Sequence, residues 1–152
     1  MFDLAAELPR LLPKAITWAE TQEASAHRHG RALTVAGTRL AESVGVRYPK
    51  RIRVVEVSEL PFPTDLELRL AATETGLLGP HMAGLTLGYA VFIRTGHYSA
   101  RLISHECRHV YQYESAGSIA AFLPIYLSQI VFFGYEQAPF EVDARAHERD
   151  VA

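Results

Sequence analysis

The pentapeptide at residues 105–109, His-Glu-Cys-Arg-His, constrains this chain more than any other segment. In a helix, residues four apart lie one turn above each other, so His105 and His109 project from the same face. Two imidazoles on one face can hold one metal ion, and the neighbouring Glu106 then lies beside the water that the ion carries. The pentapeptide therefore predicts a helix that binds a metal, with Glu106 as a general base.

The residues around the pentapeptide favour a helix. Residues 98–114 place apolar side chains on one side and His105, His109 and Gln112 on another. Cys107 lies on the side away from both histidines and is predicted to be a small buried hydrophobe rather than a ligand or nucleophile. The alternative is a helix whose histidines are buried and satisfied by ordinary hydrogen bonds.

Length and charge limit the class of protein. A chain of 152 residues can bury enough surface for one self-sufficient domain, so residues 1–152 are predicted to form one. The 15 basic and 17 acidic residues are spread along the chain, which excludes the electrostatic footprint of a nucleic-acid-binding protein. A single cysteine excludes an internal disulfide, and the first residues lack the features of a secretory signal. The expected location is the cytoplasm.

Hydrophobic periodicity and turn residues predict an α+β fold. Pro9 and Pro13 are expected to restrict the beginning of the first helix. Helices other than the motif helix are predicted at residues 13–28, 33–44, 64–75, 119–133 and 139–150. Thr64 and Ser118 are predicted to cap the helices at 64–75 and 119–133, Gly117 to end the motif helix and Gly134 to end the helix at 119–133. Two β-branched or apolar runs predict strands at residues 52–57 and 85–93. We expect a small sheet packed with helices and the motif helix at the centre.

The predicted helix at residues 119–133 is apolar almost all round. With 15 residues it is too short for a membrane span of about 20, so no transmembrane segment is predicted. A helix that is hydrophobic on all sides is usually buried, which favours a place in the core. The alternative is a docking face for a protein partner or a membrane surface.

Two histidines do not complete a catalytic zinc site, so a third protein ligand is required. The HExxHxxGxxH solution is absent, because Gln112 and Ser115 stand where glycine and histidine would be needed. A glutamate from a later helix is the remaining common solution. The last predicted helix offers four candidates, of which the first is preferred: Glu141, Asp143, His147 and Glu148. Alternatively, Glu141 and Asp143 serve only to stabilise the first turn of that helix.

Residues 85–148 resemble the gluzincin group of zinc metallopeptidases, in particular its minimal single-domain members. His105, Glu106 and His109 match its HExxH motif, and residues 141–144 resemble its glutamate-x-x-alanine signature. The predicted strand before the motif helix is similar to the edge strand that holds an extended substrate in such enzymes. Arg145 stands where many members place an aspartate that orients a histidine ligand.

The resemblance implies a zincin-like fold and a Zn²⁺ ion held by His105, His109 and Glu141. It also implies that Glu106 activates a water molecule to hydrolyse peptide bonds in a peptide or protein substrate. Two other functions stay open: hydrolysis of a non-peptide amide or small molecule, and a non-catalytic binding role on the same scaffold. Tyr98, Tyr135 and His97 are each able to donate a hydrogen bond to an oxyanion. The first 80 residues carry no recognisable motif and are expected to complete the core.

Overall fold

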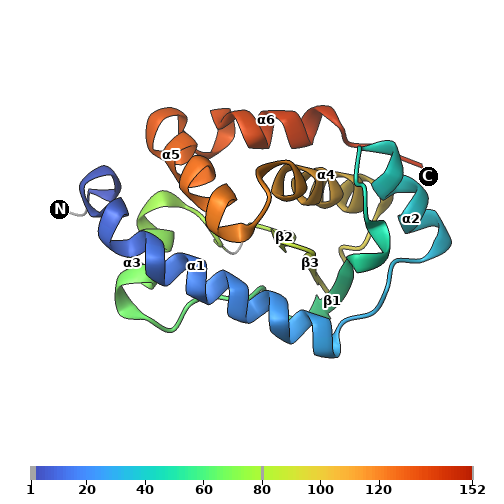
Figure 1. Cartoon of the computed structure of the whole chain (residues 1–152), viewed down its shortest axis with the longest axis horizontal. Helices are drawn as coiled ribbons and strands as arrows, with labels where there is room; N and C mark the ends of the chain where they lie inside the picture. The colour runs from blue at the N-terminus through green and yellow to red at the C-terminus, as the bar shows by residue number, and fades with distance from the viewer. Residues whose placement is uncertain (1–2, 80, 152) are drawn as a thin grey trace.

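The computed structural model describes residues 3–79 and 81–151. Within this part of the chain, six α-helices pack around a three-stranded mixed sheet, which confirms the predicted α+β class (Figure 1). The helices are α1 (Leu4–His29), α2 (Val35–Ser43), α3 (Leu66–Thr75), α4 (Ala100–Ala116), α5 (Ile119–Gln137) and α6 (Pro139–Ala146). The strands are β1 (Arg53–Val57), β2 (Gly84–Leu87) and β3 (Ala90–Arg94), and a short 3-10 helix, η1 (Pro49–Arg51), precedes β1.

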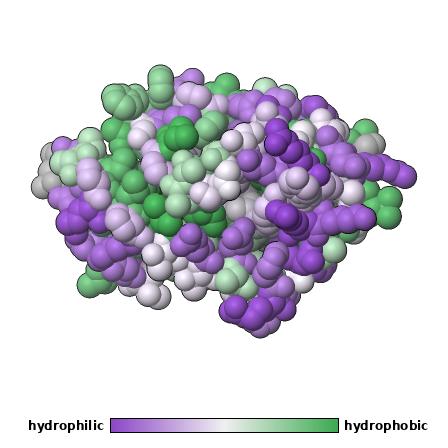
Figure 2. All heavy atoms as spheres, viewed as in Figure 1, coloured by the Kyte–Doolittle hydropathy of each residue, from purple (hydrophilic) through white to green (hydrophobic). Residues whose placement is uncertain are grey.

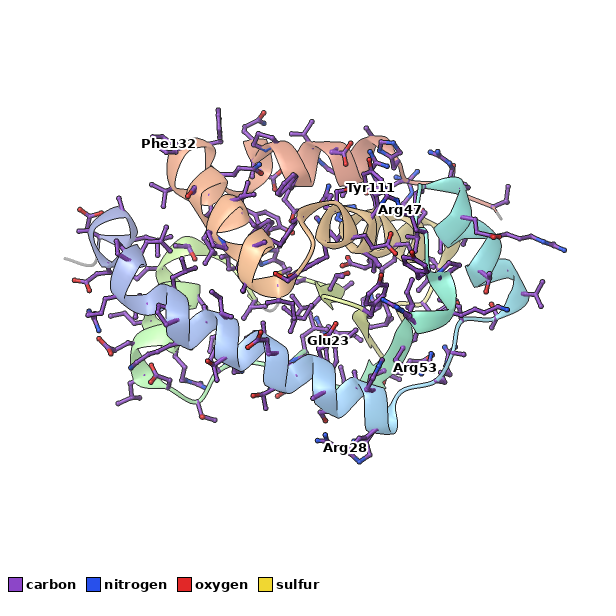
Figure 3. The ribbon with its side chains drawn as sticks, viewed as in Figure 1. Glu23, Arg28, Arg47, Arg53, Tyr111 and Phe132 are labelled. Atoms are coloured by element: carbon purple, nitrogen blue, oxygen red, sulfur yellow. The ribbon has the colours of Figure 1, made fainter. Side chains whose placement is uncertain are left out.

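The sheet has the strand order β1-β3-β2, with β1 parallel and β2 antiparallel to β3. The prediction of one strand over residues 85–93 is wrong, because the chain reverses at Gly88 and Tyr89 to make a hairpin. Gly88 has a φ of +65°, which favours glycine. The Glu23 side chain of α1, labelled in Figure 3, accepts a hydrogen bond. The donor is the Tyr89 N–H at 2.8 Å, and this contact holds the turn. An unbroken apolar run concealed this turn in the sequence.

The first helix is longer than predicted. It begins at Leu4, where the Asp3 side chain accepts a hydrogen bond from the Ala6 N–H, and both Pro9 and Pro13 lie inside it. The expectation that these prolines restrict the beginning of the helix is therefore wrong. Packing of α1 against α3, α5 and the sheet stabilises the whole helix, and such packing outweighs local propensity.

Other element ends follow the predicted capping residues more closely. Gly117 ends α4 with a φ of +104°, and the Ser118 hydroxyl accepts a hydrogen bond from the Ala121 N–H at the start of α5. The third helix is capped by Asp65 rather than by Thr64, because the Asp65 carboxylate accepts from the N–H groups of Glu67 and Leu68 at 3.0 and 3.1 Å. An aspartate one residue later competes successfully with the threonine.

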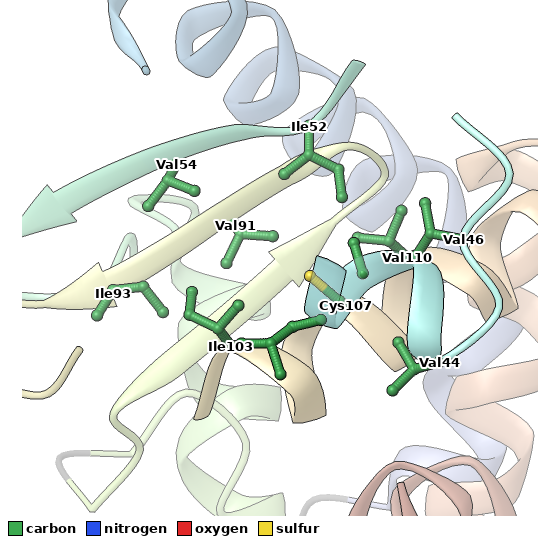
Figure 4. Close-up of a cluster of buried hydrophobic side chains, with 11 residues drawn as sticks. Val44, Val46, Ile52, Val54, Val91, Ile93, Ile103, Cys107 and Val110 are labelled. Atoms are coloured by element: carbon green, nitrogen blue, oxygen red, sulfur yellow. The ribbon is translucent and has the colours of Figure 1, made fainter. Parts of the chain in front are cut away.

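One side of α4 forms the main apolar core. Ile103, Cys107 and Val110 are fully buried against side chains of α2, β1 and β3 (Figure 4). Burial raises the pKa of the Cys107 thiol to about 12, so the prediction of an inert buried cysteine is confirmed. The other side of α4 faces α6 and β2, and Figure 1 shows the helix between α6 and the sheet. The predicted central place of the motif helix is therefore also confirmed.

The expectation that the apolar helix α5 lies in the core is wrong for its last two turns, beyond the buried Ile130. Phe132 is 81% exposed and Phe133 is 56% exposed, and Figure 3 shows Phe132 pointing away from the molecule. The N-terminal half contributes buried side chains such as Phe122, and Gly134 has a non-helical conformation at the predicted end. By length and composition alone α5 is able to cross a membrane, a test that core helices of soluble proteins and signal sequences also pass.

Candidate metal centre

Three side chains from two helices converge on one point. His105 and His109 on α4 and Glu141 on α6 offer ligand atoms that all lie within 4.8 Å of one another. The His105 Nε2 atom is 3.4 Å from Oε1 of Glu141, and the His109 Nε2 atom is 3.3 Å from Oε2. Helical spacing thus places both histidines on one face, as the sequence predicts, and the packing of α6 on α4 brings Glu141 to them.

The geometry of this group fits a metal ion. Two ligands bonded at about 2.0–2.1 Å to one tetrahedral ion are separated by about 3.3 Å, close to the two nitrogen–oxygen distances observed. The Glu141 Oε1 atom is buried and has no hydrogen-bond partner within the described part of the chain. A buried acceptor without a partner is costly, and a cation between the three side chains would satisfy it. Two imidazoles and one carboxylate suit zinc and similar divalent metals.

Each histidine is held at the ring nitrogen that faces away from Glu141. The Nδ1 atom of His105 lies 2.9 Å from Oε2 of Glu148, and the Nδ1 atom of His109 lies 2.8 Å from Oε1 of Gln112. An acceptor at Nδ1 keeps the proton there and leaves Nε2 free to bind a metal. Glu148, a sequence candidate for the third ligand, is instead the orienting partner of His105. Arg145 takes no such role, because its guanidinium donates to the Glu136 carbonyl.

The orientation of the Gln112 amide is itself determined by its neighbours. Its Nε2 group donates to the Phe140 carbonyl at 3.0 Å and to Oδ2 of Asp143 at 2.9 Å, so the amide oxygen faces His109. Asp143 in turn accepts a 2.7 Å hydrogen bond from Nε of Arg108. Asp143 therefore acts on the centre through Gln112 and is not one of the converging ligands. The sequence left the role of Gln112 open; its place three residues after His109 was the available signal.

The three converging groups shift one another's pKa values. Burial alone would raise the pKa of Glu141, but attraction to His109 and the closeness of both imidazoles lower it well below its usual range. Burial would lower the pKa of His109, yet the Glu141 carboxylate outweighs this and raises it to about 9. The pKa of His105 is raised for the same reason, against the effect of burial. The Tyr126 hydroxyl donates a 2.8 Å hydrogen bond to Oε2 of Glu141 and further stabilises the carboxylate.

Glu106 lies next to the converging side chains, between α4 and the strand β2. The residue is 5% exposed, and its Oε1 atom accepts a 2.8 Å hydrogen bond from the Thr86 hydroxyl. A Cβ atom at Gly84 would lie 2.9 Å from Oε2, so glycine at this position leaves room for the carboxylate. Neither Thr86 nor Gly84 was identified from the sequence as part of the site, because the strand-to-helix contact joins residues 20 positions apart.

Two cavities meet at this centre. One is an apolar pocket of about 150 Å³ between the sheet and the helices α1, α3 and α5, and the other is a more open and polar cavity of about 380 Å³. The residues that line both cavities are Met82, Gly84, His105, Glu106 and Tyr135. A molecule that fills both cavities would therefore pass across the histidines and Glu106.

The structure separates the three candidate oxyanion donors. Tyr135 lines both cavities, and burial raises its pKa, so its hydroxyl keeps its proton at neutral pH. His97 lines the open cavity but not the apolar pocket, and Tyr98 lines neither of the two. The Tyr98 ring instead lies 5.4 Å from the guanidinium of Arg31. Tyr135 is therefore the candidate that the fold brings to the centre.

Comparisons with known proteins add no assignment. A scan against protein-family models, a search of curated proteins and a search of solved structures each found no match. The protein's function is therefore inferred from the residues of the site and their geometry.

Proposed function

We propose that this protein is a zinc-dependent hydrolase of peptide bonds, with His105, His109 and Glu141 as the zinc ligands. The observation that carries the proposal is the convergence of two Nε2 atoms on a buried carboxylate whose Oε1 has no hydrogen-bond partner among the described residues. Two histidines and one glutamate form a known catalytic zinc set, which leaves a position open for water. The resemblance of residues 105–109 and 141–144 to the gluzincin pattern supports the same assignment.

Each remaining side chain of the site has a defined role in this proposal. Bound zinc would lower the pKa of its water and polarise the substrate carbonyl. Glu106 accepts the proton of the attacking water and returns it to the leaving amine. The Thr86 hydroxyl holds Oε1 of Glu106 and so orients the carboxylate. Tyr135 donates a hydrogen bond to the oxygen that becomes negatively charged.

The open edge of β2 supports a peptide substrate. In an antiparallel ladder alternate residues direct their backbone groups away from the partner strand, and the hairpin register gives this place to Gly84 and Thr86. The Tyr113 hydroxyl already donates to the Thr86 carbonyl at 3.3 Å, which leaves the backbone groups of Gly84 for a substrate. Gly84 is itself buried, but it lines both cavities beside Glu106. The other half of the predicted docking strand, β3, is paired on both sides and cannot bind a peptide in this way. Main-chain recognition would then be limited to a short segment.

One observation favours the second candidate function, hydrolysis of a small non-peptide amide. The apolar pocket beside the centre holds about 150 Å³, which is little more than one side chain. A small substrate could place its apolar part there without using β2. Cleavage of acylated single amino acids but of no longer peptide would support this second function.

The experiment that tests the proposal combines metal analysis with the Glu106→Gln variant. We expect about one zinc per chain in the protein purified without chelators, and the same content in the variant. Loss of the general base should lower the rate of peptide-library cleavage by about 10²–10⁴-fold. Glu74→Gln, an exposed position on α3, is the matched control and should retain full activity.

The two halves of this experiment have different consequences. Full activity in Glu106→Gln would contradict the proposed mechanism. Loss of zinc from Glu106→Gln would instead show that this carboxylate holds the site together. Zinc-loaded protein that cleaves no member of the library or the acylated amino acids would contradict the hydrolase function.

A further inference from the structure

The apolar pocket beside the centre gives the first part of the chain a role. One wall is formed by Ala15, Trp18 and Ala19 on successive turns of α1, and another by Leu68 and Ala72 on α3. The three alanines leave the space that larger side chains would fill. Figure 2 shows hydrophobic side chains gathered over the same region, between α5 and α1. Residues without any sequence motif thus shape the space next to the converging ligands.

A stack of aromatic rings forms a further wall of the pocket. The Tyr113 and Phe122 rings are stacked with centroids 3.9 Å apart, and the Tyr126 ring follows at 5.6 Å from Phe122. Both tyrosine hydroxyls already have acceptors, the Thr86 carbonyl for Tyr113 and the Glu141 carboxylate for Tyr126. The rings therefore offer carbon rather than hydroxyl groups to a ligand. Among the described residues that line the pocket, the carboxylates are Glu106 and Glu141 of the centre.

The size and polarity of the two cavities indicate what each can hold. A dry cavity of about 150 Å³ with aliphatic and aromatic walls takes up a molecule of benzene size, and this pocket has about that volume. The open cavity is lined by His81, His97, Ser99 and Arg101, which suit a solvated polar chain. Both cavities reach Glu106. A substrate hydrolysed there would therefore have an apolar group in the pocket on one side of the cleaved bond and a polar segment in the open cavity on the other.

We propose that the apolar pocket binds one bulky apolar group of the substrate, of phenyl or isobutyl size, attached next to the amide bond that is cleaved. The part that concerns cleavage rests on the proposed hydrolase function, whereas binding of the apolar group does not. The pocket is too small for a long acyl chain. The class of substrate is therefore an amide with one aromatic or branched aliphatic group beside the reacting bond.

Trp18 provides a direct test, because it is the only tryptophan of the chain and lines the pocket. Metal-free protein is titrated with N-alkylacetamides from methyl to octyl and with N-benzylacetamide, and the fluorescence of Trp18 is recorded. We expect saturable binding. The affinity should rise about fourfold with each added methylene while the alkyl chain still fits the pocket. Longer chains should bind no more tightly, because the pocket is then full. N-benzylacetamide should bind about as tightly as the best alkyl compound. A response that does not saturate, or that ignores chain length, overturns the proposal.

Two variants connect the response to the pocket. Ala15→Phe should fill the space and lower the affinity for N-benzylacetamide by about tenfold or more. Ala24→Phe, on the exposed side of the same helix, is the matched control and should change nothing. Leu127→Ala enlarges the pocket, so the affinity should go on rising to longer alkyl chains than in the wild-type protein. An unchanged chain-length profile in Leu127→Ala overturns the proposal even if Ala15→Phe does not fold.

Cleavage by the zinc-loaded protein separates this inference from the proposed function. Peptide cleavage with a preference for a bulky apolar residue at one position, lost in Ala15→Phe, supports both. Cleavage without any such preference overturns the substrate class and leaves the hydrolase intact. Amide binding by a protein that cleaves nothing overturns the hydrolase and leaves the pocket as a binding site for apolar amides.

Discussion

The two sides of α4 form an instructive contrast. On one side Ile103, Cys107 and Val110 pack into a fully apolar cluster, where the volume of each side chain matters (Figure 4). On the other side a hydrogen bond at Nδ1 holds each of His105 and His109, and here the orientation of each ring matters. Apolar packing tolerates changes that conserve volume, whereas a metal centre is sensitive to the loss of a single acceptor. One helix therefore carries two regions that should respond differently to substitution.

The largest effect on stability is expected on the apolar side. Ile103→Ala removes a fully buried side chain and should lower the free energy of unfolding by about 2–5 kcal/mol, because it leaves a cavity. Zinc affinity of the folded variant should stay at the wild-type value. Urea unfolding followed by circular dichroism measures the first quantity, and competition with a chelator measures the second. A large loss of zinc affinity would show that the two sides of α4 are coupled.

The largest effect on the polar side is expected for Glu141→Ala. A zinc site with four ligands stabilises by about 10–16 kcal/mol, so one ligand is worth about 3 kcal/mol, or on the order of a hundredfold in affinity. Asp143→Ala is the matched control, since Asp143 lies on the same helix and reaches the centre only through Gln112. Competition titration separates the two variants. The ligand assignment on α6 is wrong if Asp143→Ala loses the metal while Glu141→Ala keeps it.

A smaller loss of zinc affinity is expected when the hydrogen-bond acceptor of a histidine ligand is removed. Gln112→Leu keeps most of the side-chain volume but takes the oxygen from Nδ1 of His109, so zinc affinity or activity should fall by about 10–100-fold. The free energy of unfolding of the metal-free protein should change less than in Ile103→Ala. Gln137→Leu, at an exposed position near the end of α5, is the control. Wild-type zinc affinity in Gln112→Leu would show that His109 needs no oriented partner.

The smallest predicted effect is the change in zinc affinity for each unit of pH. Without metal, the pKa of His109 is raised to about 9, so below that pH the ring is protonated and zinc must displace a proton. The pKa of Glu141 is lowered, so this carboxylate adds nothing near neutral pH. Apparent affinity should therefore rise by about tenfold or more per pH unit and level off above pH 9. Chelator competition from pH 6 to 9.5 tests this, and a flat profile below pH 8 would contradict it.

The success of the sequence-based predictions depended on how local the signal was. The pairing of His105 with His109, the end of α4 at Gly117 and the capping role of Ser118 follow from neighbours within one or two turns, and the structure confirms them. The predicted ends of other elements were less accurate, because packing of α1 and competition between capping residues decide them. The hairpin at Gly88 was missed because both of its strands are apolar.

The partners of the site residues show the limit of the same approach. Glu148 was identified as a candidate ligand, but the structure places it behind His105 as an acceptor for Nδ1. Thr86 was not identified, and it holds the Glu106 carboxylate. Tyr135 could not be distinguished from Tyr98 and His97, and only the position of the chain after Gly134 places it at both cavities. The role of each of these residues depends on a long-range contact.

The sequence by itself determined that a helix would present two histidines and an adjacent carboxylate, because the 3.6-residue period of a helix is a property of its backbone. It also determined the α+β class, through hydrophobic periods and turn residues. Only the tertiary structure decided that Glu141 meets the histidines, that Gln112 and Glu148 orient them, and that α1 borders an apolar pocket. The reason is that the packing of one element on another depends on the whole core, which no local pattern encodes.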